Sequence, residues 1–237
     1  MSSNFQSKIV TGIAAALVAG VSHAGPIATR AELAGLLGGG GNLETFEAFP
    51  VSAADAVTLT CAVLNNAANC NGQSGLVVPG MDIRWGLASG QWNGAGRGGA
   101  PSKEILSGAP GSPPGEPLEI DFTQPVQAFG VDLRAFVNFG AKAQLKIFDA
   151  DDKLINVDIQ KDLPADGTPV FLGWENAGGI GRIELRQVGQ AWSPVIDNLQ
   201  FGTFSTVVPV PEPSALSLVA LGLAGLFARR LTLRARS

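Results

Sequence analysis

The sequence predicts an all-β fold, an antiparallel β-sandwich, with a signal helix before it and a single transmembrane helix after it. Two observations predict the sandwich. Short runs of alternating apolar and polar residues recur at intervals of about 8 to 15 residues, and no long amphipathic helical pattern separates them. A third observation, a charge-free apolar run near each end, predicts the two terminal helices.

Residues 1–24 are a predicted signal peptide. Lys8 precedes the apolar run, and Ser22-His23-Ala24 puts small residues at the −3 and −1 positions of a cleavage site. The alternative is a short buried helix, which the glycines within the run disfavour. We therefore expect an exported chain that is cut after Ala24.

Residues 25–43 predict a short helix and a glycine-rich linker. Thr29 and Glu32 have the spacing of a capping box, and leucines follow at helical intervals. This pattern predicts a helix over residues 30–37. The four glycines at 38–41 end it and form a flexible joint.

Residues 44–203 are the predicted sandwich domain, which is long enough to form its own core. Its clearest strands alternate, so that every second side chain lies on one face. Residues 89–117 are rich in Gly, Pro, Ser and Ala and predict a long surface loop. The predicted strands cover residues 43–49, 57–64, 81–85, 117–122, 128–136, 143–149, 154–159, 169–174, 180–188 and 195–201.

Composition excludes several classes of function. The only histidine is His23, inside the predicted signal peptide, so the mature chain has no imidazole for a Ser-His-Asp triad, a Cys-His pair or a histidine-ligated zinc site. Lys8 and four C-terminal arginines lie outside residues 25–213, which leaves 11 of the 16 basic residues against all 20 acidic ones, a net charge of −9. Because this surface repels phosphate backbones, we expect no nucleic-acid partner.

Cys61 and Cys70 are the only cysteines. Exported chains meet oxidising surroundings, where a close pair usually forms a structural disulfide. The alternatives are a redox-active pair, which normally has the tighter C-x-x-C spacing, and a metal site, which would need more ligands. We predict the disulfide.

The C-terminal segment has three parts. Residues 204–213 form a linker that ends in Pro211-Glu212-Pro213, and prolines there cannot continue a strand or a helix. Residues 214–228 are apolar and uncharged, and predict a transmembrane helix shorter than the usual span of about 20 residues. Residues 229–237 are basic and are expected to stay in the cytoplasm.

This order of tripeptide, apolar span and Arg229-Arg230 resembles the sorting signal of PEP-CTERM proteins. The resemblance implies a Gram-negative source and a membrane-embedded exosortase that recognises Pro211, Glu212 and Pro213, with Arg229 and Arg230 as the retained end. It further implies transient membrane anchoring, followed by delivery to the cell surface or outside, and association with exopolysaccharide or biofilm matrix.

The body is similar, more weakly, to jelly-roll domains of other PEP-CTERM proteins. The resemblance rests on the order of Phe129-Gly130-Val131, Ile147 to Asp151, Phe171 to Trp174 and Ile196 to Phe201. Such domains resemble carbohydrate-binding modules in shape, which implies a polysaccharide as a second candidate partner beside the exosortase.

Calcium is the one cofactor that the sequence suggests. Glu44 and Glu47 on the first strand and Asp197 on the last could tie the two strands through a structural calcium, since hard oxygen ligands suit this ion. The alternative is that Asp197 only caps a turn. The acidic segment 149–152 is a second oxygen-rich turn, and a solvated hairpin explains it equally.

Trp92 is the predicted contact for a sugar, because it lies in the Gly-rich stretch and is expected to be exposed. Trp174 follows an apolar run and is expected in the core. Paired carboxylates could also serve a glycoside hydrolase, but no pair stands out by its placement. The sequence favours a non-enzymatic surface or matrix protein, with a carbohydrate-binding module and then a glycoside hydrolase as alternatives.

Overall fold

The computed structural model describes residues 24–85, 89–107, 117–135, 141–188 and 193–205. The sorting tripeptide, the predicted transmembrane segment and the basic tail lie outside these residues, as does all of the predicted signal peptide except Ala24. Within the described part of the chain, no helix is long and apolar enough to cross a membrane.

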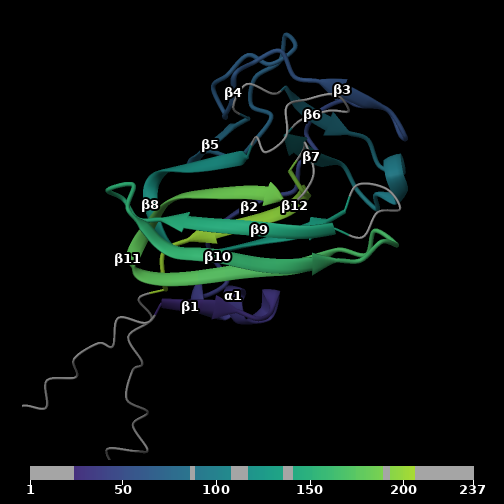
Figure 1. Cartoon of the computed structure of the whole chain (residues 1–237). Helices are drawn as coiled ribbons and strands as arrows, with labels where there is room; N and C mark the ends of the chain where they lie inside the picture. Colours follow the sequence, from purple (N-terminus) through teal and green to yellow (C-terminus); the bar gives the residue numbers. More distant parts are fainter. Residues whose placement is uncertain (1–23, 86–88, 108–116, 136–140, 189–192, 206–237) are drawn as a thin grey trace, which may run out of the picture.

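Twelve strands of the described residues pair into one antiparallel sheet (Figure 1). The predicted all-β class and antiparallel pairing are therefore confirmed. The elements are β1 (Ala24–Ile27), α1 (Arg30–Leu36), β2 (Asn42–Glu44), β3 (Ala56–Thr58), β4 (Val63–Leu64), β5 (Met81–Arg84), β6 (Gly90–Asn93), β7 (Glu104–Ser107), β8 (Leu118–Arg134), β9 (Ala141–Phe148), β10 (Leu154–Leu163), β11 (Val170–Gln187) and β12 (Val195–Gly202), with a 3-10 turn over Arg97–Gly99.

Two long strands, β8 and β11, run through both halves of this sheet. The early part of β8 pairs with the late part of β11, as Ile120 with Ile183, and the late part of β8 pairs with the early part of β11, as Phe129 with Trp174. Between these stretches the register shifts, and Gly179 adopts φ +95. Such a bulge bends the strands and divides the sheet.

We call the two parts the open half and the covered half. The open half joins β4, β5, the early part of β8, the late part of β11, β9 and β10. The covered half joins β1, the early part of β11, the late part of β8, β12, β2, β7, β6 and β3.

One core cluster spans both halves, which makes the body sandwich-like. Alternate residues of each strand enter it, because successive side chains of a strand point to opposite faces. On β8 these include Leu118 and Ile120 in the open half, and Phe129, Val131 and Leu133 in the covered half; all five are fully buried.

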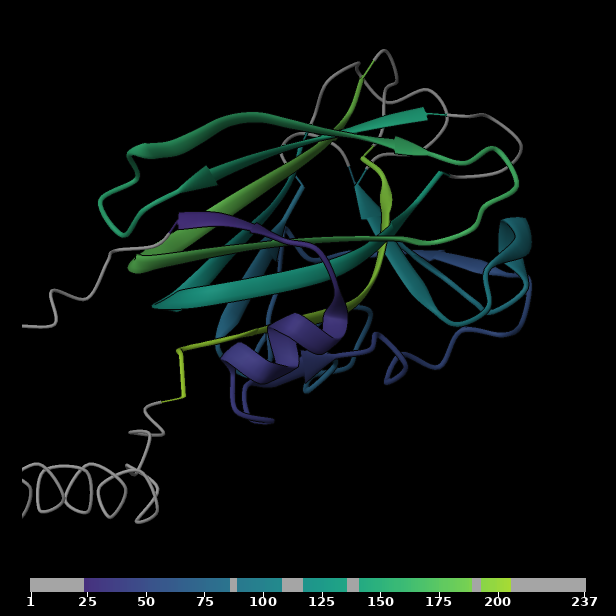
Figure 2. The ribbon, with the colours of Figure 1, turned by 90° about the horizontal axis from the view of Figure 1, so that it is seen from below.

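The N-terminal segment covers the outer face of the covered half (Figure 2). The predicted N-cap forms, because the Thr29 side chain accepts the Glu32 N–H at 3.1 Å; the Glu32 carboxylate in turn accepts the N–H of Ala28, one residue before the cap, at 2.8 Å. The helix follows at Arg30–Leu36, within one residue of its predicted end. β1 precedes it and pairs with β11, so residues 25–43 belong to the body rather than to a linker.

Two further predictions about the strands need correction. Residues 89–117, predicted as a loop, contain β6 and β7, which pair with each other in the sheet. Small residues suit this place, since a Cβ on Gly90 would overlap the ring of Trp85. The predicted strand over residues 57–64 is divided between β3 and β4, which pair with different neighbours.

The predicted disulfide is confirmed between Cys61 and Cys70, with the Cα atoms 5.0 Å apart. Cys70 is fully buried, and its backbone pairs with that of Gln73 in an isolated antiparallel β-bridge. Asn65 shapes the loop between the cysteines, because its side-chain oxygen accepts the N–H groups of Ala67 and Ala68. The disulfide therefore closes an Asn-rich turn.

Candidate functional site

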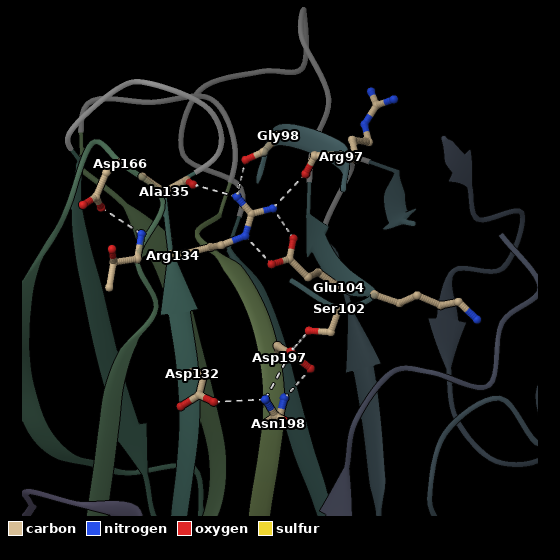
Figure 3. A network of polar contacts seen from close by, with 12 residues as sticks. Arg97, Gly98, Ser102, Glu104, Asp132, Arg134, Ala135, Asp166, Asp197 and Asn198 are labelled. Carbon is tan, nitrogen blue, oxygen red and sulfur yellow. Dashed lines mark hydrogen bonds and ion pairs between the residues drawn. The ribbon is translucent and has the colours of Figure 1, made fainter. Parts of the chain in front are cut away.

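A polar cavity of about 240 Å³ lies on the outer face of the covered half, where β7, β8 and β12 meet the loops before β7 and β11 (Figure 3). The side chains that point outward from β8 alternate with its core residues. Ala128 is covered by α1, whereas Asp132 and Arg134 reach the cavity. The lining residues are Pro101, Ser102, Glu104, Asp132, Leu133, Arg134, Pro169, Val195, Asp197 and Asn198.

A buried ion pair between Arg134 and Glu104 forms one wall of the cavity. Both side chains are only 2% exposed, and the guanidinium contacts both carboxylate oxygens. Its remaining N–H groups donate to the carbonyls of Gly98 at 3.0 Å, Ala135 at 3.2 Å and Arg97 at 3.2 Å (Figure 3). Burial raises the pKa of Glu104, and the hydrogen bonds from Arg134 oppose that rise.

Asp197, Asn198 and Asp132 form the opposite wall. β12 bulges here, and Asn198 adopts φ 48, a conformation that asparagine tolerates better than most residues. Its amide Nδ2 donates to Asp132 at 3.1 Å and to Asp197 at 3.2 Å. Arg30 of α1 adds an ion pair to Asp132 at 2.7 Å. The helix is thereby attached to the cavity wall.

Asp197 carries the cavity's least compensated charge. Ser102 donates its hydroxyl to this carboxylate, and the Asn198 N–H donates to it at 2.7 Å. Burial raises the pKa of Asp197, and these two hydrogen bonds oppose the rise. The cavity therefore offers fixed hydrogen-bond acceptors, which suit a small hydroxyl-bearing ligand.

The predicted calcium ligands are engaged elsewhere. Glu44, on β2, accepts the N–H groups of Phe46 and Val78, the latter at 2.7 Å. Glu47 accepts the Lys103 N–H at 2.8 Å and pairs with its ammonium at 3.8 Å. Among the residues that the structure describes, no three acidic or cysteine side chains are placed to hold a metal ion. Calcium at Glu44, Glu47 and Asp197 stays a prediction.

Trp92 is buried, with 0% exposure, so the prediction of an exposed ring is wrong. It lies on β6, a strand paired on both sides, and its ring stacks on Phe49 at 5.2 Å. Its Nε1–H donates to the Phe46 carbonyl at 2.9 Å. The ring therefore stabilises the body and cannot contact a sugar in this conformation. Trp174 is buried, as predicted.

A second hollow, of about 630 Å³, is a charged groove on the open half. The Arg182 guanidinium lies 3.7 Å from the centre of the Phe148 ring and 2.7 Å from Asp152, and it also pairs with Glu184. Arg84 pairs with Asp121 at 3.4 Å, on the neighbouring strands. Arginine and carboxylate side chains arranged along a sheet can hydrogen-bond vicinal hydroxyls in pairs.

Sequence reasoning identified Asp197 but missed Arg134, Glu104 and Asp132. The available signal was a pair of charges within an apolar run: Asp132 and Arg134 alternate with apolar residues over positions 128–136. A buried arginine requires a carboxylate partner, which the pattern alone does not locate. Glu104 was hidden because its segment was assigned to a loop.

Comparisons with known proteins identify the C-terminal segment. The family model of the PEP-CTERM protein-sorting motif matches residues 209–231. The chain therefore carries a PEP-CTERM sorting motif behind a β-rich body. The motif indicates an exported protein whose tail is recognised by an exosortase. The matched range contains Pro211, Glu212, Pro213, Arg229 and Arg230, whose separate roles stay predictions.

Among solved structures, the chain is similar to a glycoside hydrolase family 43 arabinoxylan arabinofuranohydrolase from Bacillus subtilis, in complex with cellotetraose. The identity is 16% and the TM-score 0.28, over 42% of this chain and 21% of that chain. A likeness this distant supports no conclusion about fold or activity. The comparison with curated proteins finds no match.

Proposed function

We propose that this chain is a non-enzymatic protein of the cell surface or extracellular matrix, where its body associates with exopolysaccharide. One observation carries the proposal: a PEP-CTERM motif at residues 209–231 follows a separately folded body. The motif accounts for export and sorting, and the body is then the part that acts outside the cell.

The chemistry of the body supports a structural role over catalysis. In the polar cavity, Glu104 is held by Arg134, and Asp132 is held by Arg30. A catalytic pair of carboxylates needs one group free to donate a proton and another free to attack or activate water. The Cys61–Cys70 bridge suits an oxidising compartment.

Replacing the tripeptide tests the proposal. In the native host, Pro211→Ala/Pro213→Ala should leave the full-length chain in the inner membrane, because the altered motif is no longer recognised. Pro164→Ala, which changes an exposed proline of the body, is the control. Cell fractionation with intact-mass measurement reports both location and cleavage. Surface delivery of the motif variant at the wild-type level would overturn the proposal.

A carbohydrate-binding module of jelly-roll type is the second candidate. The charged groove favours it, because Arg182 stacks on Phe148 and places its N–H groups beside carboxylates. Titration of the mature protein with a panel of polysaccharides, with and without calcium, tests this candidate. We expect binding that Arg182→Met abolishes. Absence of binding across the panel would exclude the candidate. A chelator-dependent loss of melting temperature would support calcium at Glu44, Glu47 and Asp197.

A further inference from the structure

The two ends of the body lie on one side, next to α1 (Figures 1 and 2). β1 begins at Ala24 and pairs with β11, while the chain after β12 returns along α1. There the Ser205 N–H donates to the Leu36 carbonyl at 2.9 Å. The point where the sorting tail begins is therefore in direct contact with the N-terminal segment.

We call residues 204–205, where the chain leaves the body toward the sorting motif, the exit. We call residues 24–41 the N-terminal clamp, because they hold the exit against the sheet. The Phe204 N–H donates to the Gln127 side chain at 2.8 Å, and its ring joins an apolar cluster beneath α1. Arg30 fastens the clamp to Asp132 at 2.7 Å. The apolar cluster contains Ile27, Leu33, Leu37 and Ala128, with Leu36, Phe171 and Phe204 packed against them.

Clamp and exit also pack tightly at Gly38. A Cβ at this position would overlap the Oγ and Cβ atoms of Ser205. The neighbouring Gly39 has a similar backbone, φ +75 against +62 for Gly38, yet a Cβ there would meet nothing within 4 Å. Glycine is therefore required at position 38 for two reasons: its positive φ, which forms the turn after α1, and the close packing of Ser205 against it.

The reach of the chain keeps the sorting motif near this surface. Pro211 follows Ser205 by six residues, and an extended chain spans at most about 3.6 Å per residue, so the motif lies within about 22 Å of Ser205. A groove of about 580 Å³ opens beside the exit, lined in part by Gly80, Pro125 and Phe201. An enzyme that grips the motif therefore works within about 22 Å of Ser205.

We propose that the N-terminal clamp sets where and in which direction the sorting tail leaves the body, and that the membrane-embedded sorting enzyme contacts this face during processing. This inference rests on the proposed function, because only a sorted tail must be presented to an enzyme. The covered half then faces the membrane while the tail is anchored.

Gly38→Ala and Gly39→Ala form a matched pair that tests the clamp in the full-length chain. Each places a side chain at a positive φ, so both carry a similar backbone strain. Only Gly38→Ala displaces Ser205. In a pulse-chase in the native host, we expect Gly38→Ala to be processed about tenfold more slowly than Gly39→Ala, since small misplacements cost rates of this order.

A rescue variant separates displacement from loss of stability. Ser205→Gly removes the atoms that a Cβ at position 38 would overlap, so Gly38→Ala/Ser205→Gly should recover the rate of Ser205→Gly alone. If Gly38→Ala does not accumulate, an insertion of about ten Gly and Ser residues after Ser205 takes its place, because it leaves the clamp intact and frees the motif from the body. The insertion should also slow processing.

The outcomes distinguish the two proposals. Wild-type processing of Pro211→Ala/Pro213→Ala overturns the proposed function and with it this inference. If that variant is blocked while Gly38→Ala matches Gly39→Ala, or while the insertion is processed at the wild-type rate, only the clamp is overturned. Equal slowing of both alanine variants, with equal losses of melting temperature, also overturns it.

Discussion

The open and covered halves share β8 and β11 but use the outward side chains of these strands differently. In the open half, Asp121 and Arg182 line a groove and are 27% and 17% exposed. In the covered half, Arg134 is 2% exposed, because the loops before β7 and β11 lie over it. The same alternation therefore produces a solvated charged face in one half and a buried polar network in the other.

Covering a charged face changes what its ion pairs contribute to the stability of the fold. Ion pairs in water gain little, because solvent screens them and side-chain entropy opposes them. Removing one partner of a buried pair leaves an uncompensated charge, which is expensive. Matched substitutions in the two halves should therefore have unequal effects on the free energy of unfolding.

Arg134→Met tests the covered half. Methionine retains the apolar stem but leaves the buried Glu104 carboxylate without its cation. We expect the free energy of unfolding to fall by about 3–5 kcal/mol, measured by denaturant titration followed by tryptophan fluorescence. The double variant Glu104→Leu/Arg134→Met removes both charges and should recover most of this loss. A loss below about 1 kcal/mol for the single variant would show that solvent reaches this pair.

Much of the architecture could be predicted because it depends on local pattern. Alternation along residues 117–122 and 128–136 located the two parts of what is one continuous strand, β8, and alternation along residues 143–149 located β9. The Thr29 cap located α1, and the spacing of Cys61 and Cys70 indicated their disulfide. In each case, neighbouring residues in the sequence supply the physical cause.

The rest depends on contacts between distant segments. Trp92 was assigned to an exposed loop because glycine surrounds it, yet pairing with β3 and β7 buries it. The partners Glu104 and Arg134 come from different strands, and no local signal joins them. The pairing of distant strands decides whether such side chains are buried and what they contact. The alternation of apolar and polar residues along one strand does not encode that pairing.

Carboxyl groups in both halves should make stability depend on pH, and the most deeply buried of them lie in the covered half. Burial raises the pKa of Glu44, which is 4% exposed, and of Asp197, which is 8% exposed. A carboxyl group whose folded pKa is raised contributes stability below its unfolded pKa and loses it as the pH rises through the folded value. We therefore expect thermal melts to show a higher melting temperature near pH 5 than at pH 7.

Glu44→Gln is the variant for this measurement, since it removes one titrating group while keeping the side-chain length. The difference in melting temperature between the two pH values should shrink. Asp151→Asn, on the exposed turn after β9, is the control. A melting temperature that rises with pH in the wild-type chain, or a Glu44→Gln profile equal to the wild type, would contradict the assignment.

Arg182→Met tests the open half and should have the smallest effect on stability. Its partner Asp152 is 70% exposed, so that ion pair is screened, but its partner Glu184 is only 12% exposed and would lose its cation. Methionine can still pack on the Phe148 ring. We expect a loss of about 1–2 kcal/mol, under that of Arg134→Met in the same titration. Equal losses would end the distinction between the halves. Because folding is little affected, a loss of polysaccharide binding in this variant would report on the groove itself.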